Sequence, residues 1–256
     1  MTEKRKPHRG TIYKICRFFA EAVYRGTRIE GVEKLKEKNT IIVANHAQLN
    51  GPMIGELFLP EDCYIWANGQ MFKRGEVADY AMEDFFPYKK RWLRPLCRLT
   101  SHLLSFLLPS IMSGARAIPV YRDARIVSTF KTTMKHLKDG DNILIFPECH
   151  KRDNNILNKF QENFIDIARL YHRRCGVELN FLPMYIAPEM KLSVIGEGIR
   201  YNSENEPEAE RHRISSYLSA EITRMGRELP SHTVIPFDNL NRKQYITNKD
   251  VDCLPG

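Results

Sequence analysis

The sequence predicts an α/β protein whose central sheet is mostly parallel and flanked by helices. Two observations lead to this class: short β-branched runs alternate with helix-length segments, and several runs end in Pro, Gly or polar residues. At 256 residues the chain is long enough for one large domain or two small ones. A hydrophobic fraction of 43% and a charged fraction of 27% are ordinary for a globular protein, so extensive disorder is not expected.

The first half of the chain contains three predicted strands. A helix over about 11–24 precedes the apolar run 40–44, which is expected to be a strand that ends at His46. A helix is expected to begin beyond Pro52, because proline suits the first turn of a helix. The remaining elements are a short strand at 64–67, an insertion-like region at 72–112, rich in aromatic and basic residues, and a strand at 117–121.

The second half alternates helices and strands. A helix over 124–137 is expected to stop at Asp139-Gly140, because glycine favours the conformation that ends a helix. The elements predicted after it are a strand at 142–146, a helix at 155–171, strands at 179–186 and 192–195, and a helix at 207–227. The predicted organisation is a basic amphipathic segment over 1–27, an α/β domain over 28–230 that holds the insertion, and a polar tail over 231–256.

The formal net charge of +8 suits an anionic partner, such as a phospholipid surface, a phosphorylated substrate or a nucleic acid. In the first segment, basic side chains surround an aromatic and aliphatic stripe, a mixture typical of a helix that docks on a membrane interface. A solvated tail followed by a packed amphipathic helix would give the same pattern, so both interpretations stay open. The basic residues are Lys4, Arg5, Lys6, Arg9, Lys14 and Arg17, and the apolar ones are Ile12, Tyr13, Ile15, Phe18, Phe19, Val23 and Tyr24.

Residues 99–115 carry no formal charge, and the stretch 103–108 is strongly apolar. The window is shorter and more polar than the about 20 apolar residues that a spanning helix needs. It predicts a helix that is partly inserted in a membrane, with a buried core helix as the alternative. No secretory signal pattern is found. We therefore expect the protein at the cytoplasmic face of a membrane, as a peripheral or monotopic protein.

Cysteine spacing gives no indication of a metal site. The six cysteines are scattered without a Cys-x-x-Cys pair, and we interpret them as free thiols in a reducing compartment. The sequence also lacks a helix-turn-helix signature, a zinc pattern and an RNA-recognition set of aromatic residues. No metal and no nucleic-acid partner are therefore expected.

Four segments share one pattern, in which an apolar strand ends and polar residues with Pro or Gly follow. Because the carboxyl ends of strands line the ligand crevice of an open α/β sheet, we expect these segments to meet. His46 is the central candidate, since an imidazole with an unperturbed pKa of about 6.5 accepts and returns a proton near neutrality. The segments are Asn45-His46, Gly114 with Ile118-Pro119-Val120-Tyr121-Arg122, Phe146-Pro147-Glu148, and Leu182-Pro183.

This set resembles the glycerolipid acyltransferases, the phospholipid/glycerol acyltransferase family that includes lysophosphatidic acid acyltransferases. The family pattern is Asn-His-x-x-x-x-Asp, a Gly-x-x-x-Ile-x-Arg variant, Phe-Pro-Glu-Gly-Thr-Arg and a Val-Pro-like segment, and the four matches follow this order over about 29–198. The resemblance implies transfer of a fatty acyl group to the hydroxyl of a lysophospholipid or glycerol-phosphate acceptor. The acyl donor would be acyl-CoA or acyl-carrier protein, as a co-substrate, and no cofactor is implied.

The chemistry of such a transfer assigns roles to these residues. It needs a base for the hydroxyl proton, donors for the developing oxyanion and an anchor for the acceptor's anion. His46 is expected to be the base, and Arg122 to hold a phosphate through its planar fork, with Lys151 adding positive charge. Glu148 is expected to position the acceptor or to orient a neighbour. The other expected substrate-binding residues are Asn45, Gly114 and Pro147.

The first motif departs from the family pattern at the carboxylate. Gly51 stands where the family has an Asp that orients the imidazole, and glycine has no side chain to accept a hydrogen bond. Three interpretations stay open. The amide oxygen of Asn50 replaces the Asp, another carboxylate such as Glu56 or Glu148 reaches in, or the protein is a weakened or inactive lipid-binding relative.

The third motif departs as well, because Cys149-His150-Lys151 stand where the family has Gly-Thr-Arg. Lys151 keeps the positive charge but lacks the bidentate fork of arginine. His150 introduces a second imidazole, either as a substitute base or as a polar loop residue.

Overall fold

The computed structural model describes residues 9–84 and 91–250, which divide into two compact units. Unit 1 comprises Met1–Val23 and Ile65–Thr133, and unit 2 comprises Tyr24–Tyr64 and Met134–Gly256. Parts of three predicted features lie outside the described residues: the basic residues 4–6, the insertion residues 85–90 and the tail residues 251–256.

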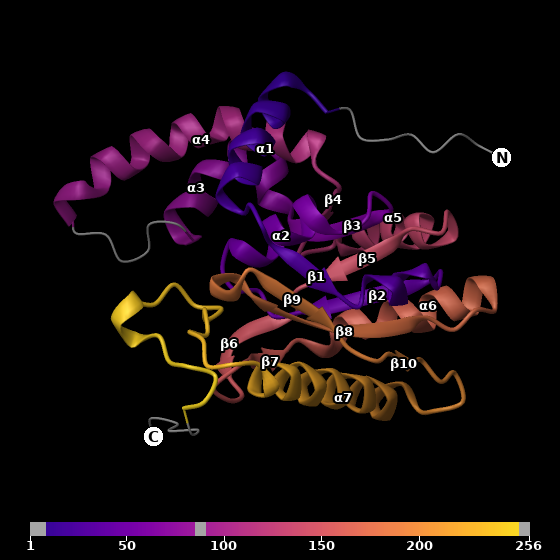
Figure 1. Ribbon diagram of the computed structural model, residues 1–256. Coiled ribbons are helices and arrows are strands. Elements are labelled where there is room, and N and C mark those ends of the chain that lie inside the picture. Colours follow the sequence, from indigo (N-terminus) through magenta and orange to yellow (C-terminus); the bar gives the residue numbers. More distant parts are fainter. Residues whose placement is uncertain (1–8, 85–90, 251–256) are drawn as a thin grey trace. The chain divides into compact units, whose positions relative to one another are not determined.

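Unit 2 is built on a mostly parallel sheet in the strand order β1-β9-β8-β2-β5 (Figure 1). The central strand β2 pairs in parallel with β5 and β8, and β1 pairs in parallel with β9. Strand β8 pairs in antiparallel fashion with β9 and with the short β10. The predicted α/β class is thereby confirmed. The strands are β1 (Arg28–Glu30), β2 (Thr40–Ala44), β5 (Asn142–Ile145), β8 (Asn180–Ala187), β9 (Leu192–Ile195) and β10 (Ile199–Arg200).

The core of unit 2 is centred on β2, whose five residues are all buried. A continuous apolar run suits a strand that is covered on both faces, as strands of parallel sheets are. The long helix α7 packs against β8. The helices of the unit are α2 (Asn50–Phe58), α6 (Asp166–Cys175) and α7 (Pro207–Glu228), and the short 3-10 turns are η1 (Val32–Lys36), η4 (Glu162–Ile165), η5 (Pro188–Met190) and η6 (Arg242–Gln244).

The helix predicted over 155–171 is wrong in its first part. Residues 148–152 and 158–160 form a separate antiparallel hairpin, β6 (Glu148–Arg152) and β7 (Asn158–Phe160), and the helix α6 begins only at Asp166. The side chain of Asn154 accepts hydrogen bonds from the N–H groups of Ile156 and Leu157. This local turn reverses the chain and prevents a helix, as asparagine side chains commonly do.

The described part of unit 1 combines a pair of parallel strands with helices α1, α3, α4 and the first part of α5. The last residues of β3 (Cys63–Asn68) pair in parallel with β4 (Ala117–Val120). The insertion folds largely into two helices, α3 and α4, that pack on each other. The helices are α1 (Thr11–Val23), α3 (Arg74–Asp84), α4 (Arg94–Gly114) and α5 (Ile126–Lys138), of which the last runs on into unit 2, and the 3-10 turns are η2 (Gly69–Phe72) and η3 (Arg91–Leu93).

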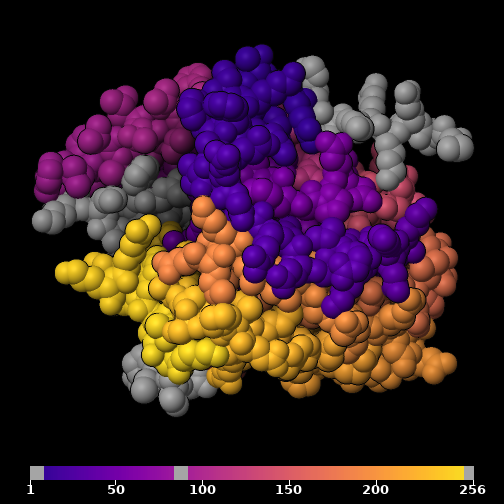
Figure 2. Space-filling view, viewed as in Figure 1, coloured from indigo at the N-terminus to yellow at the C-terminus, as the bar shows by residue number. Residues whose placement is uncertain are grey.

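Helix α1 packs on the end of α4. The ring of Tyr13 is buried against Gly114, where an added Cβ atom would lie 2.7 Å from the ring. In the space-filling view, α1 (indigo) and α4 (magenta) form part of the visible surface (Figure 2). Both helices keep large apolar side chains exposed: Ile12, Ile15, Phe18, Phe19 and Val23 on α1, and Leu96, Leu99, Leu103, Phe106 and Leu107 on α4.

Among the described residues, no helix is both long and apolar enough to cross a membrane.

Candidate active site

Asn45 fastens the end of the central strand to its neighbour. Its amide oxygen accepts the N–H of Ile186 at 2.7 Å, and its amide nitrogen donates to the carbonyl of Ile186 at 3.0 Å. The buried side chain thus continues the hydrogen bonding of β2 with β8 by one residue beyond Ala44. Asn45, predicted to bind substrate, is therefore placed where it determines the position at which His46 leaves the sheet.

The backbone turns sharply after His46. Ala47 and Gln48 have φ angles of 46° and 55°, in the left-handed region that residues other than glycine seldom occupy. The N–H of Gly51 donates to the carbonyl of His46 at 3.1 Å and closes the turn. Such strained conformations persist only where surrounding contacts hold them, and they concentrate at functional sites.

Glu148 holds this turn from the neighbouring strand end. One carboxylate oxygen accepts the N–H of His46 at 2.6 Å, and the other accepts the N–H of Asn158 on β7 at 2.8 Å. Burial raises the pKa of Glu148 to about 7, against the two hydrogen bonds, which lower it, and with a smaller contribution from the charge of Asp238. Both oxygens serve main-chain donors, so Glu148 positions the His46 backbone.

The ring of His46 is half-buried between two phenylalanines. Its centroid lies 5.1 Å from that of Phe146 and 5.6 Å from that of Phe237, and both contacts are edge-on. Phe146 follows β5, whereas Phe237 comes from the C-terminal tail. The two rings restrict the orientation of the imidazole at the carboxyl end of β2.

The amide of Asn50 is engaged within the same region. Its oxygen accepts the hydroxyl of Tyr24 at 3.0 Å, and its nitrogen donates to the carbonyl of Ala47 at 2.9 Å. The predicted role of Asn50, as a substitute for the missing Asp, remains a prediction, and the contacts seen stabilise the turn.

Gly51 is required by close packing. A Cβ atom at this position would overlap the carbonyl oxygen of His46 and would lie 2.9 Å from the ring of Phe146. No side chain fits there without movement of the His46 turn. The absence of the family's Asp is thus tied to the shape of the turn itself.

The C-terminal tail contributes residues to this site. The sequence did not predict this contribution. The side chain of Gln48 donates to the carbonyl of Asp238 at 3.1 Å and to the hydroxyl of Tyr245 at 2.9 Å. Asn158 donates to the carboxylate of Asp238 at 3.1 Å. An isolated Phe-Asp pair in a polar stretch has no periodicity that would mark it, so only the tertiary structure reveals its position.

His150 brings a second imidazole to the same region. Its Nδ1 lies 2.6 Å from an oxygen of Asp238, and its ring centroid lies 5.1 Å from that of Phe237. The neighbouring Lys151 is exposed, and the carbonyl of Pro147 accepts the N–H of Gln161 at 2.8 Å. The motif 146–151 therefore gives one buried carboxylate, one held imidazole and one solvent-exposed ammonium.

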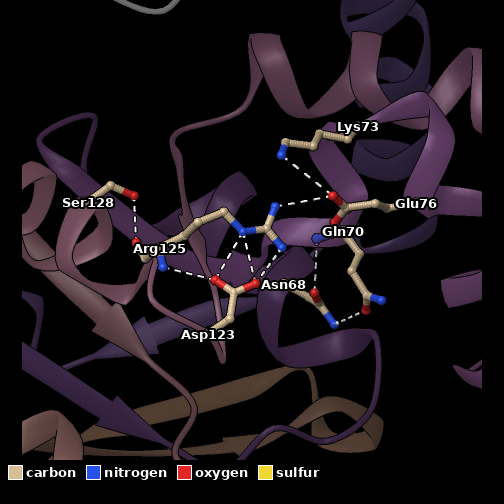
Figure 3. A network of polar contacts seen from close by, with 7 residues as sticks. All are labelled: Asn68, Gln70, Lys73, Glu76, Asp123, Arg125 and Ser128. Atoms are coloured by element: carbon tan, nitrogen blue, oxygen red, sulfur yellow. Dashed lines mark hydrogen bonds and ion pairs between the residues drawn. The ribbon is translucent and has the colours of Figure 1, made fainter.

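Arg122 and Gly114 belong to unit 1. Arg122 is exposed and makes no hydrogen bond or ion pair within the described ranges. Arg125, three residues later, is already neutralised (Figure 3): it bonds Asp123 at 2.8 Å and Glu76 at 3.1 Å. The Arg125 guanidinium lowers the pKa of Asp123 to about 2.

Among the residues that the structure describes, no three His, Cys, Asp or Glu side chains are grouped so that they could hold a metal ion. A polar hollow of about 670 Å³ lies elsewhere in unit 2. Its two arginines are paired, Arg200 with Glu37 and Arg213 with Glu210, and we do not assign it a ligand.

Comparison with known proteins finds similarity to solved structures and no matching family. No family model and no curated protein match the chain. One solved structure similar to it is the 1-acyl-sn-glycerophosphate (LPA) acyltransferase PlsC from Thermotoga maritima, at 14% identity and a TM-score of 0.48. The alignment covers 85% of this chain and 81% of that one. At this level of similarity the likeness assigns neither a family nor an activity to the chain.

Replacing Glu148 by Gln is expected to lower the free energy of unfolding by about 1–3 kcal/mol, because an amide accepts only one of the two buried N–H groups. Glu162→Gln, in η4 of the same unit, is the matched control and should change stability little. Denaturant titration followed by circular dichroism measures both. A Glu148→Gln protein as stable as the control would show that the two hydrogen bonds of Glu148 do not stabilise the fold.

The same pair of proteins gives a pH test. A carboxyl whose pKa rises from about 4.5 to about 7 on folding binds more protons in the folded state over that interval, so its contribution to stability falls as pH increases. The wild type should therefore lose more stability between pH 5 and pH 8 than Glu148→Gln does. Equal losses would show that Glu148 titrates in the folded protein as it does in the unfolded chain.

Placing a carboxylate at position 51 through Gly51→Asp should lower stability, because the new side chain has to displace the His46 turn. Overpacking of this kind costs about 1–3 kcal/mol. Thermal unfolding checks it, with Gly75→Ala as control, since a Cβ there meets nothing within 4 Å. An unchanged melting temperature for Gly51→Asp would show that the turn accommodates a side chain at position 51.

Proposed function

We propose that this protein transfers a fatty acyl group from a thioester, acyl-CoA or acyl-carrier protein, to the hydroxyl of a lysophospholipid or glycerol-phosphate acceptor. The observation that carries this proposal is the His46 turn: an imidazole at the carboxyl end of the central parallel strand, with its backbone held by a buried carboxylate. Sites at this edge are where open α/β sheets bind their ligands.

In the proposed reaction His46 is the general base. The acceptor oxygen attacks the thioester carbon while the imidazole takes its proton, a C–O bond forms, and the carbonyl electron pair moves to oxygen. When that pair returns, the C–S bond breaks and the thiolate leaves with its bonding electrons and takes up the proton from His46. Glu148 acts as a positioning residue because its carboxylate holds the His46 backbone.

Two residues are proposed to bind anions, each considered within its own unit: Arg122 in unit 1 and Lys151 in unit 2. The guanidinium of Arg122 is exposed and unengaged within the described ranges, and arginine presents a planar fork that matches phosphate. The nearby Arg125 is unsuited to this role, because two carboxylates already occupy its donors.

A second function, lipid binding without catalysis, is favoured by one observation. Gly51 leaves no space for the carboxylate that the acyltransferase motif uses to orient its histidine. In the Ser-His-Asp proteases, exchanging the orienting Asp for Asn lowers turnover about 10⁴-fold. A relative that kept the fold and lost the orienting group would bind lipid and turn over slowly or not at all.

We also propose that the exposed apolar faces of α1 and α4 bind a phospholipid surface. The ten exposed side chains belong to two helices that pack on each other, and basic residues accompany them on both helices, among them Lys14, Arg94 and Arg98. Apolar area with basic residues is the pattern by which helices lie in a membrane interface. Peripheral or monotopic association with a cytoplasmic membrane face stays a prediction.

The catalytic proposal is tested with purified protein, acyl-CoA and lysophosphatidic acid, with release of the thiol followed over time. His46→Ala should lower kcat by about 10²–10⁴, the usual contribution of a general base. His172→Ala, on α6, should leave the rate unchanged. Equal rates for His46→Ala and the wild type would exclude His46 as the base, and lipid binding without turnover in the wild type would support the second function.

The membrane proposal is tested by sedimentation with vesicles of phosphatidylcholine and phosphatidylglycerol. The double variant Phe18→Gln, Phe19→Gln should partition about 10²–10⁴-fold more weakly, because burial of each ring contributes about 1.5–3 kcal/mol. Val127→Gln removes an exposed apolar side chain of the same unit from α5 and should bind like the wild type. If the double variant also bound like the wild type, α1 would not contact the lipid.

A further inference from the structure

The pair of His150 and Asp238 is a second histidine–carboxylate pair beside the His46 turn. Nδ1 of His150 lies 2.6 Å from the carboxylate of Asp238. The side chain of His150 is 82% exposed and that of Asp238 is 33% exposed. The proposed mechanism leaves this pair without a role.

Asp238 is held from two sides, unlike the carboxylate of an ordinary surface ion pair. Its second oxygen accepts the side-chain amide of Asn158 at 3.1 Å, and its backbone carbonyl accepts the amide of Gln48 at 3.1 Å. Gln48 belongs to the His46 turn and Asn158 is bonded to Glu148. The orientation of His150 is therefore coupled to the residues that position His46.

One aromatic ring contacts both imidazoles. The ring of Phe237 contacts His46 at 5.6 Å and His150 at 5.1 Å between centroids. Both imidazoles therefore lie beside the same side chain. The ring nitrogen of His150 that remains for a substrate is Nε2, because Nδ1 faces the carboxylate.

The surroundings of His150 include side chains of both charges. The contact between Nδ1 and the Asp238 carboxylate fixes the orientation of the ring. Lys151 and Arg152 follow on the same strand, and Glu148 lies two residues before it. Tyr245 is the other titratable side chain that the tail brings to Gln48. When both ring nitrogens carry a proton, Nδ1–H donates to Asp238 and Nε2–H is left to donate to a substrate.

We propose that His150 donates this hydrogen bond to the thioester carbonyl oxygen during acyl transfer, with Asp238 as its positioning residue. The inference rests on the proposed function and adds an oxyanion donor to it. As the acceptor oxygen attacks and His46 takes its proton, the carbonyl oxygen gains the electron pair, and Nε2–H of His150 stabilises the charge. His150 is unchanged after the C–S bond breaks. Donors of this kind contribute about 10²–10³ to kcat.

The kinetic test uses acyl-CoA and lysophosphatidic acid. His150→Gln should lower kcat by about 10²–10³ with little change in either KM, because the bond forms with the developing oxyanion. His150→Lys keeps a charged donor and should recover most of the loss. Asp238→Asn should lower kcat in the wild-type background and have little effect on kcat in the His150→Lys background. If Asp238 had a purely structural role, Asp238→Asn would lower kcat in both backgrounds.

The matched control is His212→Gln. His212 also faces a carboxylate, Glu162, at 3.8 Å, and the two side chains are 78% and 38% exposed. It should leave kcat unchanged. A kcat for His150→Gln equal to that of His212→Gln would overturn the proposal, and so would a His150→Lys protein as slow as His150→Gln, since that result would mean that proton acceptance and not donation is required.

A binding measurement separates this inference from the proposed function. The probe is a long-chain trifluoromethyl ketone analogue of acyl-CoA, whose hydrate mimics the tetrahedral intermediate, with calorimetry as the readout. His150→Gln should weaken its binding about tenfold or more, and His212→Gln should not. If the wild type showed no acyl transfer but His150→Gln still weakened binding of the analogue, the proposed function would be refuted and the hydrogen bond from His150 would be supported. If His150→Gln and the wild type bound the analogue with equal Kd values, the hydrogen bond from His150 would be refuted.

Discussion

The carboxylate of Glu148 is the interaction on which the rest of the site depends. It joins two main-chain segments, the His46 turn after β2 and the start of β7, through two hydrogen bonds in a buried position. A buried carboxylate is costly unless donors surround it, and its raised pKa of about 7 records that cost. The hairpin β6–β7 and the turn are consequently held at a fixed separation. This separation sets the positions of His46, on the turn, and of His150, on β6.

The turn after His46 explains the departure at Gly51 in physical terms. Two consecutive left-handed residues, Ala47 and Gln48, bring the chain back so closely that the N–H of Gly51 meets the carbonyl of His46. Only glycine fits at that contact. The geometry that delivers the imidazole to the strand end thus excludes a side-chain carboxylate at the position where the family has one. Asp238, from the tail, supplies a carboxylate to the other imidazole instead.

In unit 1, charge and apolar area are distributed unevenly. Arg125 is paired with two carboxylates, whereas Arg122 is exposed and forms no ion pair with a described residue. Helices α1 and α4 bury Tyr13 against Gly114 and leave ten large apolar side chains in solvent. An exposed apolar surface of this kind is costly for a protein that remains in water, and it becomes favourable at a lipid surface.

The local pattern of apolar and polar residues in the sequence determined much of the fold of this protein. The α/β class, the central strand, and the position of His46 at its end follow from periodicity and β-branched composition, which act over a few residues. Only the tertiary structure decided the rest. Asn154 converts a predicted helix into a hairpin, and Asn45 bonds to Ile186, 141 residues away. Asp238 reaches His150 across 88 residues. Contacts between distant segments depend on packing, and a polar tail carries no periodicity from which that packing can be read.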